Sequence, residues 1–230
     1  MLRISPVFFC LSNYTTVMQV SSACYNRTMS TLTTAEILET LRRHLYTVER
    51  IDMLEDAIEG QQLEARKAAV LLALFEQENM LHLAFIRRAS TLRAHSGEIA
   101  FPGGSVEATD SSPAMTALRE AQEEIGLDAT DVEVLGVLTP VFTVVSNYLI
   151  LPVVAYLPHG LGELHLQISE VAELIVLPLQ ALANPAIAHT EQWSRDSMTR
   201  TVYFYDHGPY RIWGATGRML SMLLELLYAA

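Results

Sequence analysis

The chain has 230 residues and a formal net charge of −11 at pH 7, with 50% hydrophobic residues and 18% charged residues. Its mean hydropathy of +0.24 and sequence pI near 5.0 describe a globular protein with a large core and exclude a disordered chain. The acidic balance argues against a sequence-independent grip on nucleic acid, because such binding needs a basic surface. We therefore expect no nucleic-acid partner, whereas a phosphorylated small molecule fits if divalent ions bridge the negative charges.

The N-terminal segment has an unusual composition, with no acidic residue before position 31 and only two cations, Arg3 and Arg27. A signal peptide would have a stronger apolar run, and a transit peptide would have more arginine. We interpret residues 1–33 as a leader or a mis-assigned start that is poorly ordered, with Met29 as an alternative first residue. The expected location is cytoplasmic, or an organelle matrix if the leader is a targeting segment.

Both cysteines, Cys10 and Cys24, lie in this leader. The body of the chain therefore has no disulfide, thiol nucleophile or cysteine metal site, and a reducing compartment fits. No segment reaches the ~18 uninterrupted apolar residues of a membrane span. The apolar run at 219–230 is short and interrupted by Glu225, so we interpret it as a buried helix and expect no membrane association.

The first predicted element is a helix near 34–46, opened by a capping box of Thr33 and Glu36. An acidic and mixed stretch follows, and it is typical of a linker with a short helix. We therefore interpret residues 34–67 as an N-terminal helical extension.

The rest of the chain, 68–230, is expected to form one domain in which short apolar runs lie between turn signals. The expected strands are 68–75, 80–88, 98–104, 132–142, 148–157, 171–179 and 202–205. The first two strands form a hairpin, and the third runs into a glycine turn. Two helices are expected, 113–125 with Ser112 as N-cap and Pro113 at the first position, and 215–228 at the end. Strands mixed with helices, without strict alternation, predict an α+β fold with a mixed sheet and helices on both faces.

The helix expected at 113–125 has one apolar stripe that would face a sheet. The stripe consists of Ala114, Leu118, Ala121 and Ile125. Glu120, Glu123 and Glu124 project on another face, where they repel one another and oppose the macrodipole at the helix C-terminus. Only Arg119 neutralises them from nearby in the sequence, so the cluster needs either open water or a cation.

A glycine pair, Gly103-Gly104, precedes this helix and lets the backbone approach a ligand without interference from a Cβ atom. A carbonyl of this pair could join the carboxylates around hard divalent ions, because oxygen-only ligation suits Mg²⁺ or Mn²⁺. A bare E-x-x-E-E pattern is more often a solvated acidic face. The glycine pair, the Ser-Pro helix start and the three carboxylates together favour a metal site.

The stretch 101–127 resembles the Nudix box, G-x5-E-x7-R-E-U-x-E-E-x-G-U, in which U is an apolar residue. Gly104 takes the first glycine, and residues 119–127 match the second half without a gap. The middle departs from the pattern in two ways. Asp110 stands where Glu is expected, and eight residues instead of seven separate it from Arg119.

Two further segments resemble signatures of one branch of this superfamily, the coenzyme A pyrophosphatases. Residues 87–104 carry the pattern R-x-H-x-G-E/Q-[apolar]-x-F-P-G-G, and residues 212–220 resemble the tryptophan-glycine-[ST] opening of the last helix. The branch tends to have an aspartate in a box loop that is one residue longer, which accounts for both departures. The likeness extends over residues 68–228.

The resemblance implies hydrolysis of a nucleoside diphosphate linked to another group, on a three-layer α/β/α sandwich. Glu120 and Glu124 would be the main metal ligands, and Glu123 would share that role. The carbonyl of Gly103 would complete a site for Mg²⁺ or Mn²⁺. Either Glu123 or Glu120 would accept the proton of the attacking water. Arg119 would pair with an acid of the box loop and orient the ligands.

Two residues ahead of the box, Arg93 and His95, are candidates for contacting the substrate phosphates, with a surface or supporting polar role as the alternative. Three aromatic residues, Tyr148, Phe142 and Trp213, could stack on an adenine, although core packing is the commoner role of such residues.

The primary hypothesis is a Mg²⁺- or Mn²⁺-dependent Nudix pyrophosphatase that cleaves coenzyme A or acyl-coenzyme A. One alternative is another nucleoside diphosphate substrate, such as NADH or ADP-ribose, because substrate choice lies in loops outside the box. A second alternative is a non-catalytic Nudix-fold binding module, which the clustered carboxylates disfavour. A homodimer is left open.

Overall fold

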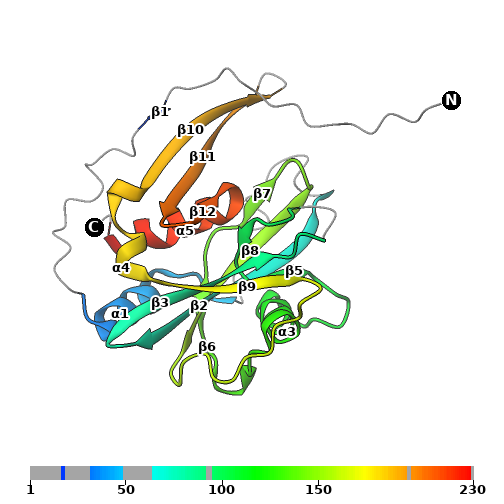
Figure 1. The fold of residues 1–230 in the computed structure, drawn as a ribbon. Helices are drawn as coiled ribbons and strands as arrows, with labels where there is room; N and C mark the ends of the chain where they lie inside the picture. The colour runs from blue at the N-terminus through cyan, green and yellow to red at the C-terminus, as the bar shows by residue number, and fades with distance from the viewer. Residues whose placement is uncertain (1–16, 19–31, 49–63, 92–94, 196–197, 229–230) are drawn as a thin grey trace.

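The computed structural model describes residues 17–18, 32–48, 64–91, 95–195 and 198–228 (Figure 1). Most of the predicted leader and of the predicted linker therefore lies outside the described residues. The described strands are β1 (Val17–Met18), β2 (Arg66–Gln77), β3 (Met80–Arg88), β4 (Ile99–Ala100), β5 (Gly103–Ser105), β6 (Glu133–Val137), β7 (Val141–Thr143), β8 (Tyr148–Leu157), β9 (Val171–Pro178), β10 (Ala188–Arg195), β11 (Met198–His207) and β12 (Tyr210–Trp213). The described helices are α1 (Thr34–His44), α3 (Pro113–Ile125), α4 (Leu179–Leu182), α5 (Gly214–Tyr228) and the short 3₁₀ turns η4 (Ala129–Asp131) and η5 (Pro185–Ile187).

The main sheet has eight strands among the described residues, with the central order β4-β3-β2-β8-β6. The strands β9, β5 and β7 pair with β3, β2 and β8. β2 and β8 run parallel, from Arg66 opposite Tyr148 to Phe75 opposite Leu157, and the other pairs of this sheet are antiparallel. The prediction of a mixed sheet is therefore confirmed.

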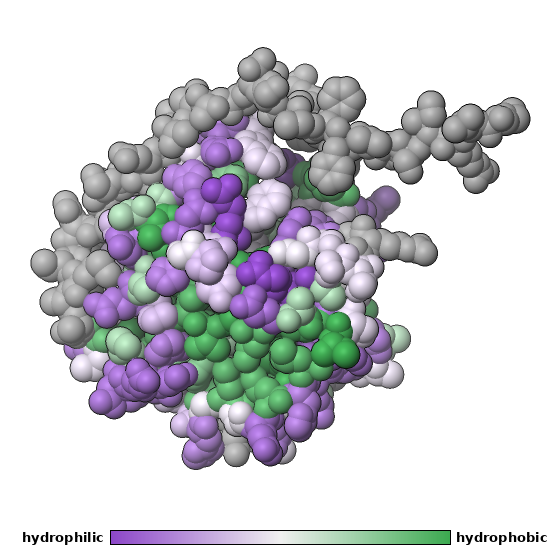
Figure 2. Space-filling view, viewed as in Figure 1, coloured by the Kyte–Doolittle hydropathy of each residue, from purple (hydrophilic) through white to green (hydrophobic). Residues whose placement is uncertain are grey.

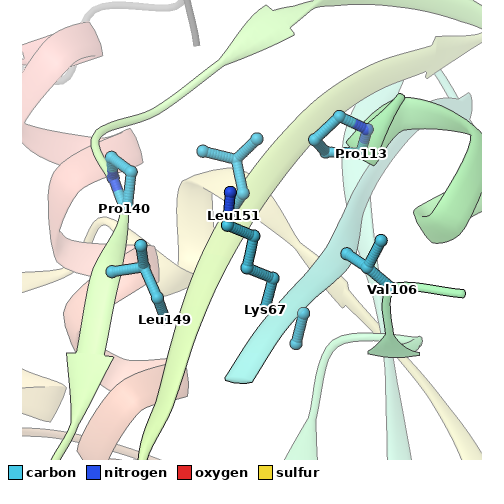
Figure 3. A pocket seen from close by; sticks show the side chains of 7 residues that line it. Lys67, Val106, Pro113, Pro140, Leu149 and Leu151 are labelled. Atoms are coloured by element: carbon cyan, nitrogen blue, oxygen red, sulfur yellow. The ribbon is translucent and has the colours of Figure 1, made fainter. Parts of the chain in front are cut away.

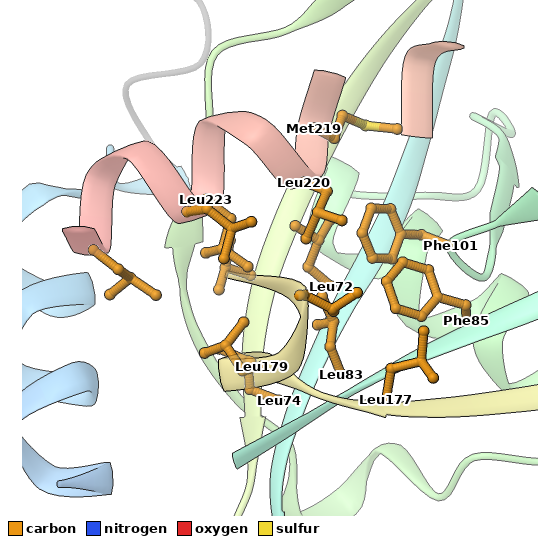
Figure 4. Close-up of a cluster of buried hydrophobic side chains, with 14 of the residues drawn as sticks. Leu72, Leu74, Leu83, Phe85, Phe101, Leu177, Leu179, Met219, Leu220 and Leu223 are labelled. Carbon is orange, nitrogen blue, oxygen red and sulfur yellow. The ribbon is translucent and has the colours of Figure 1, made fainter. Parts of the chain in front are cut away.

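Both faces of the main sheet are covered, which is why β2 is a continuous apolar run. Successive side chains of a strand point to opposite faces. The even-numbered residues of 69–75 accordingly join a cluster with α1 and α5, and the odd-numbered ones join a cluster with α3. Figure 4 shows the first cluster, in which Leu220 and Leu223 of α5 face Leu72 of β2. The α/β/α sandwich is confirmed, with α1 and α5 on one face and α3 on the other.

The first helix begins as its sequence predicts. The side chain of Thr33 accepts a hydrogen bond from the backbone N–H of Glu36, and the carboxylate of Glu36 accepts one from the backbone N–H of Thr33. This reciprocal capping satisfies two N–H groups that the helix itself leaves without partners. Ile37 and Leu41 of α1 then pack into the same cluster as α5.

The predicted hairpin is also confirmed, with a tighter turn than expected. β2 and β3 pair from Gln77 opposite Met80, so only two residues separate the strands. These residues, Glu78 and Asn79, have φ angles of 53° and 59°. Positive φ at both central positions is typical of a type I′ turn, whose twist matches that of the paired strands.

Two predicted strands are each divided in the structure. The run predicted at 132–142 forms two strands, β6 and β7, which residues 138–140 separate. The strand predicted at 98–104 forms β4 and β5, and the glycine pair lies inside β5. The expected glycine turn was therefore wrong, because Gly103 and Gly104 pair with Val70 and Ala69 of β2.

The second sheet, β1-β10-β11-β12, is larger than its sequence predicts. Only 202–205 was expected as a strand here, since β10 and the first half of β11 are mostly polar and show no apolar run. Their pairing with each other, from Ala188 opposite Tyr205 to Arg195 opposite Met198, defines them as strands. Figure 1 shows this hairpin extending beyond the main sheet.

The surface view in Figure 2 shows apolar residues gathered where Figure 1 draws β9 and α3, with hydrophilic residues around them. Partly buried leucines of the preceding loop and of β9, Leu164, Leu166 and Leu174, pack against the α3-side cluster. Of the helices in the described residues, none has the length and apolar character that crossing a bilayer requires.

Candidate functional site

The helix that carries the three glutamates begins and ends where its sequence predicts. The side chain of Ser112 accepts a hydrogen bond from the backbone N–H of Met115 at 3.3 Å, and Pro113 follows at the first helical position. Gly126 ends the helix with a φ of 73°, in the left-handed region that favours glycine. The glutamates therefore project from the last two turns of α3.

The buried stripe of α3 differs slightly from the predicted one. Ala117, not Leu118, takes the central position, and it is fully buried, as is Ala121. Leu118 is only partly buried against the cluster. Because Ala117, Ala121 and Glu124 are spaced by four and three residues, Glu124 lies on the same buried face. The helix thus places one carboxylate at a core position.

Glu124 is the most enclosed of the three glutamates, with a side chain that is only 3% exposed. Its Oε2 accepts a hydrogen bond from the backbone N–H of Gly103 at 2.9 Å. Its Oε1 lies 3.8 Å from Nη1 of Arg88. Burial raises the pKa of Glu124 to about 7, the charges of Glu120 and Glu170 add to this rise, and Gly103 and Arg88 oppose it. A divalent cation at this position would stabilise the ionised carboxylate.

Glu120 lies beside Glu124, one turn earlier, and its side chain is 16% exposed. Its Oε1 accepts a hydrogen bond from Nη1 of Arg119 at 3.0 Å. Burial raises the pKa of Glu120, and Arg119 opposes that rise. A Cβ atom on Gly104 would overlap the carboxylate of Glu120, so the absence of a side chain there leaves room for this group.

Glu123 points toward solvent, with a side chain that is 61% exposed and 3.4 Å from Nη1 of Arg119. The three carboxylates thus occupy a buried, an intermediate and an exposed position. Among the residues that the structure describes, no three His, Cys, Asp or Glu side chains already stand in a metal-binding arrangement. The donors that lie together, carboxylate and carbonyl oxygens, are nevertheless the kind that hard divalent cations prefer.

Gly103 connects the strand β5 to this site. It lies opposite Val70 of β2, and on either side of it the carbonyl of Pro102 and the N–H of Val106 make the hydrogen bonds to β2. Hydrogen-bonded and non-hydrogen-bonded pairs alternate in an antiparallel ladder, so the N–H and C=O of Gly103 are directed away from β2. The N–H meets Glu124, and the ladder leaves the carbonyl for another partner.

Arg119 pairs with an acid of the box loop, as the resemblance implied. Its Nε and Nη2 donate to the two carboxylate oxygens of Asp110 at 3.1 and 3.0 Å. Nη2 also donates to the carbonyl of Ser105 at 3.1 Å. The hydrogen bond with Asp110 raises the pKa of Arg119 further above its usual value. Arg119 therefore fixes the loop to the helix.

Asp110 is the anchor of that loop. Its side chain is 5% exposed, and it accepts hydrogen bonds from the backbone N–H of Glu107 and from the hydroxyl of Thr116, each at 2.9 Å. The hydrogen bonds from Arg119 and Glu107 hold the pKa of Asp110 well below its usual range. An aspartate at the expected glutamate position thus still supplies an acid for Arg119.

The predicted substrate-binding pair is described only in part. Arg93 lies outside the described residues. His95 lies against Glu98, with its Nδ1 2.8 Å from Oε2. Glu98 is one strand away from Arg88, whose backbone N–H donates to the Glu98 carbonyl at 3.0 Å. A role for His95 in phosphate binding stays a prediction.

The three aromatic candidates do not form one stacking surface. Phe142 and Tyr148 lie on the neighbouring strands β7 and β8. The hydroxyl of Tyr148 is 3.0 Å from that of Ser105. Trp213 belongs to the second sheet, where its ring stacks on Phe204 with centroids 6.1 Å apart.

Two charged residues near the carboxylates were missed from the sequence, Arg88 and Glu170. Both lie outside the helical half of the box, and only tertiary contacts bring them there. The backbone N–H groups of His165 and Gln167 donate to the last carbonyls of α3 at 3.0 and 2.9 Å. This contact attaches the loop before β9 to the helix, and the charge of Glu170 consequently raises the pKa values of Glu120 and Glu124.

A small cavity of about 20 Å³ lies at the other end of α3 (Figure 3). Apolar side chains line it, among them Val106, Pro113 and Leu151, together with Lys67. Pockets for small-molecule ligands measure roughly 300–1,000 Å³. This cavity is therefore too small for a nucleoside.

Comparison with known sequences finds a family model and curated relatives that match most of this chain. The model of the NUDIX domain family matches residues 65–200. A relative from Photorhabdus laumondii, named "Uncharacterized Nudix hydrolase NudL", is 39% identical over 160 residues, 70% of this chain and 84% of its own length. The protein of the same name from Citrobacter koseri is 35% identical over 176 residues, 76% of this chain and 89% of its own length.

Solved structures include a MutT/nudix family protein from Enterococcus faecalis, which is 15% identical with a TM-score of 0.47 over 85% of this chain and 73% of its own. The NUDIX domain of Shewanella oneidensis NrtR, complexed with ADP ribose, is 17% identical and has a TM-score of 0.40. The match covers 54% of this chain and 77% of that one. By its sequence match, its α/β/α sandwich and the box on α3, the chain belongs to the Nudix family and is a Nudix hydrolase. Members of this family generally use divalent metal ions.

Proposed function

We propose that the protein hydrolyses the pyrophosphate bond of coenzyme A or acyl-coenzyme A, giving 3′,5′-ADP and (acyl-)4′-phosphopantetheine. The observation that carries the proposal is the contact between Glu124 and the N–H of Gly103 at 2.9 Å. It brings the carboxylates of α3 and the backbone of β5 to one place. The choice of coenzyme A is supported by the two sequence signatures at 87–104 and 212–220.

In this proposal Glu120 and Glu124 hold Mg²⁺ or Mn²⁺, Glu123 shares that role, and the Gly103 carbonyl adds a neutral oxygen donor. The ion supplies positive charge to the phosphoryl oxygens and lowers the pKa of a bound water. Arg119 positions the ligands through Asp110, since it holds the box loop to the helix that carries all three glutamates.

The proton of the attacking water is accepted by a carboxylate near the ions, Glu123 or Glu120. Of the two, Glu123 is more exposed, and Arg119 is 3.4 Å from it and 3.0 Å from Glu120. We therefore expect Glu123→Gln to lower kcat by about a hundredfold or more, with a smaller loss of Mn²⁺ affinity than in Glu120→Gln. Glu120→Gln should weaken Mn²⁺ binding as well.

Steady-state kinetics combined with Mn²⁺ titrations of both variants would check this assignment. Glu170→Gln is the matched comparison. The charge of Glu170 raises the pKa values of Glu120 and Glu124, but among the described residues no hydrogen bond joins Glu170 to either glutamate. Wild-type kcat in Glu123→Gln, or a loss of Mn²⁺ affinity at least as large as in Glu120→Gln, would contradict the role of Glu123 as base.

The proposed function is tested with a substrate panel of coenzyme A, acetyl-coenzyme A, NADH and ADP-ribose, each with Mg²⁺ and with Mn²⁺. We expect the highest kcat/KM for a coenzyme A substrate, with 3′,5′-ADP as a product identified by chromatography. Chelation by EDTA should abolish turnover, and added metal should restore it. Fast cleavage of NADH or ADP-ribose without cleavage of coenzyme A would contradict the substrate, and no cleavage at all would favour a binding module.

A further inference from the structure

Two arginines with described side chains, Arg119 and Arg88, lie beside the carboxylates of the candidate site, and a third, Arg87, precedes Arg88 on β3. Of the three, Arg119 and Arg87 make side-chain hydrogen bonds. Arg119 makes hydrogen bonds of 3.0–3.1 Å to Asp110, Glu120 and the Ser105 carbonyl. Arg87 donates to Glu173 at 2.8 Å. All of these distances are within hydrogen-bonding range, and the bonds hold each of the two arginines in one position.

Arg88 differs from both. Its Nη1 lies 3.8 Å from Oε1 of Glu124, which is an ionic contact but too long for a hydrogen bond. Its guanidinium makes no side-chain hydrogen bond to another residue in the part of the chain that the structure describes. The side chain is 27% exposed, whereas that of Glu124 is 3% exposed. Arg88 thus presents hydrogen-bond donors beside a buried carboxylate and can be reached from solvent.

The strand β3 directs Arg88 to this place. Ala84 and Ile86 pack in the cluster on the α3 side of the sheet, and Arg88 continues their alternation. Arg87 points to the opposite face. The pairing of β3 with β9 shifts by one residue between Arg87 and Arg88, as a β-bulge with its extra residue on β9 would produce. Bulges are common beside active sites, where they re-aim side chains.

We infer that Arg88 is a substrate-binding residue that contacts the diphosphate group of the substrate, and that it pairs with Glu124 only while Glu124 has no metal ion. This inference rests on the proposed function. A divalent cation on Glu124 would take up the negative charge that faces Arg88 and repel the guanidinium, which weakens this ionic contact. Arg88 is then a planar cation with unused donors next to the position where a metal-bound diphosphate lies. The guanidinium fork matches phosphoryl oxygens in a bidentate manner.

The test uses Arg88→Gln with Arg87→Gln as the matched control, since the two arginines are neighbours on opposite faces of one strand. Mn²⁺ affinity is measured from the electron paramagnetic resonance signal of the free ion. Affinity for α,β-methylene-ADP, a nucleoside diphosphate that resists cleavage between its phosphates, is measured by calorimetry at saturating Mn²⁺.

For Arg88→Gln we expect unchanged or tighter Mn²⁺ binding, because a competing cation is removed from Glu124. Affinity for α,β-methylene-ADP should fall by about tenfold to a hundredfold, the usual effect of losing a hydrogen bond to a charged group. Arg88→Lys keeps the charge but loses the planar fork of the guanidinium. Its affinity for α,β-methylene-ADP should therefore lie between those of wild type and Arg88→Gln. Arg87→Gln should leave both affinities as in wild type.

Equal binding of α,β-methylene-ADP by wild type and Arg88→Gln would overturn the inference. A parallel loss of Mn²⁺ affinity and of thermal stability would overturn it too, because Arg88 would then only hold Glu124 in place. The inference and the proposed function fail separately, since binding of α,β-methylene-ADP requires no cleavage. A negative substrate panel contradicts the proposed function, and equal binding by Arg88→Gln contradicts the role of Arg88.

Discussion

Replacement of Glu124 by glutamine should lower turnover by about a hundredfold to a thousandfold, the usual cost of removing one charge-stabilising group from an active site. A glutamine amide is nearly the same size, and its oxygen can still accept the hydrogen bond from the N–H of Gly103. It cannot supply the negative charge that a divalent cation needs. Because the variant also removes a carboxylate that burial disfavours, we expect its Tm in EDTA to equal or exceed that of wild type.

Turnover with saturating Mn²⁺ and thermal unfolding in EDTA are the two measurements for this variant. Glu133→Gln is the matched control, because Glu133 is also a glutamate paired with an arginine, Arg42, but it is 46% exposed and lies on β6. The control should keep full turnover. Full turnover in Glu124→Gln would remove Glu124 from the proposed site.

Alanine at Gly103 should mainly lower stability, whereas alanine at Gly104 should mainly lower activity. A Cβ on Gly103 would overlap the backbone of Ala69 and Val70, and its φ of 153° disfavours any side chain. Backbone cannot move aside without breaking the β2–β5 pairing. We therefore expect Gly103→Ala to lower the free energy of unfolding by about 2–4 kcal/mol, from overpacking and backbone strain together.

A Cβ on Gly104 would instead overlap the carboxylate of Glu120, the mobile end of a side chain. The fold can accept this change if the carboxylate moves. Gly104→Ala should lower the free energy of unfolding by less than about 1 kcal/mol and reduce kcat/KM by about a hundredfold, since a displacement of 1 Å in a catalytic group has effects of that size.

Urea unfolding and steady-state kinetics of the two alanine variants separate these effects, and each variant is the control for the other. Normal kcat/KM in Gly104→Ala would show that turnover does not depend on the position of Glu120. Wild-type stability in Gly103→Ala would show that β5 can shift away from β2.

Several features of the fold could be predicted because neighbouring residues determine them. The capping box at Thr33 and the Ser112-Pro113 start of α3 are local hydrogen-bond and backbone preferences, and both are confirmed. The apolar run of β8 is confirmed at its predicted bounds, since burial on both faces leaves a continuous apolar signal. The strands β10 and β11 were mostly missed. They pair with each other through segments that are mostly polar, so no apolar pattern marks them in the sequence.

In the candidate site too, the features that depend on neighbouring residues could be predicted from the sequence. A motif within 27 residues was enough to predict which side chains gather on α3, and the helix and its caps agree with that prediction. Their metal and catalytic roles stay predictions. The resemblance to the Nudix box also implied that Arg119 pairs with an acid of the box loop, and Asp110 is that acid.

The sequence by itself determined the family, the helix that carries the carboxylates and the glycine pair that meets it, because these depend on residues close together in the chain. Only the tertiary structure decided that Glu124 is buried, that Glu123 is exposed, and that β5 supplies an N–H to the first of them. It also brought Arg88 and Glu170 to the carboxylates from β3 and from the loop before β9. The physical reason is that burial and long-range charge depend on how strands far apart in the chain pair, and periodicity along the chain does not record that pairing.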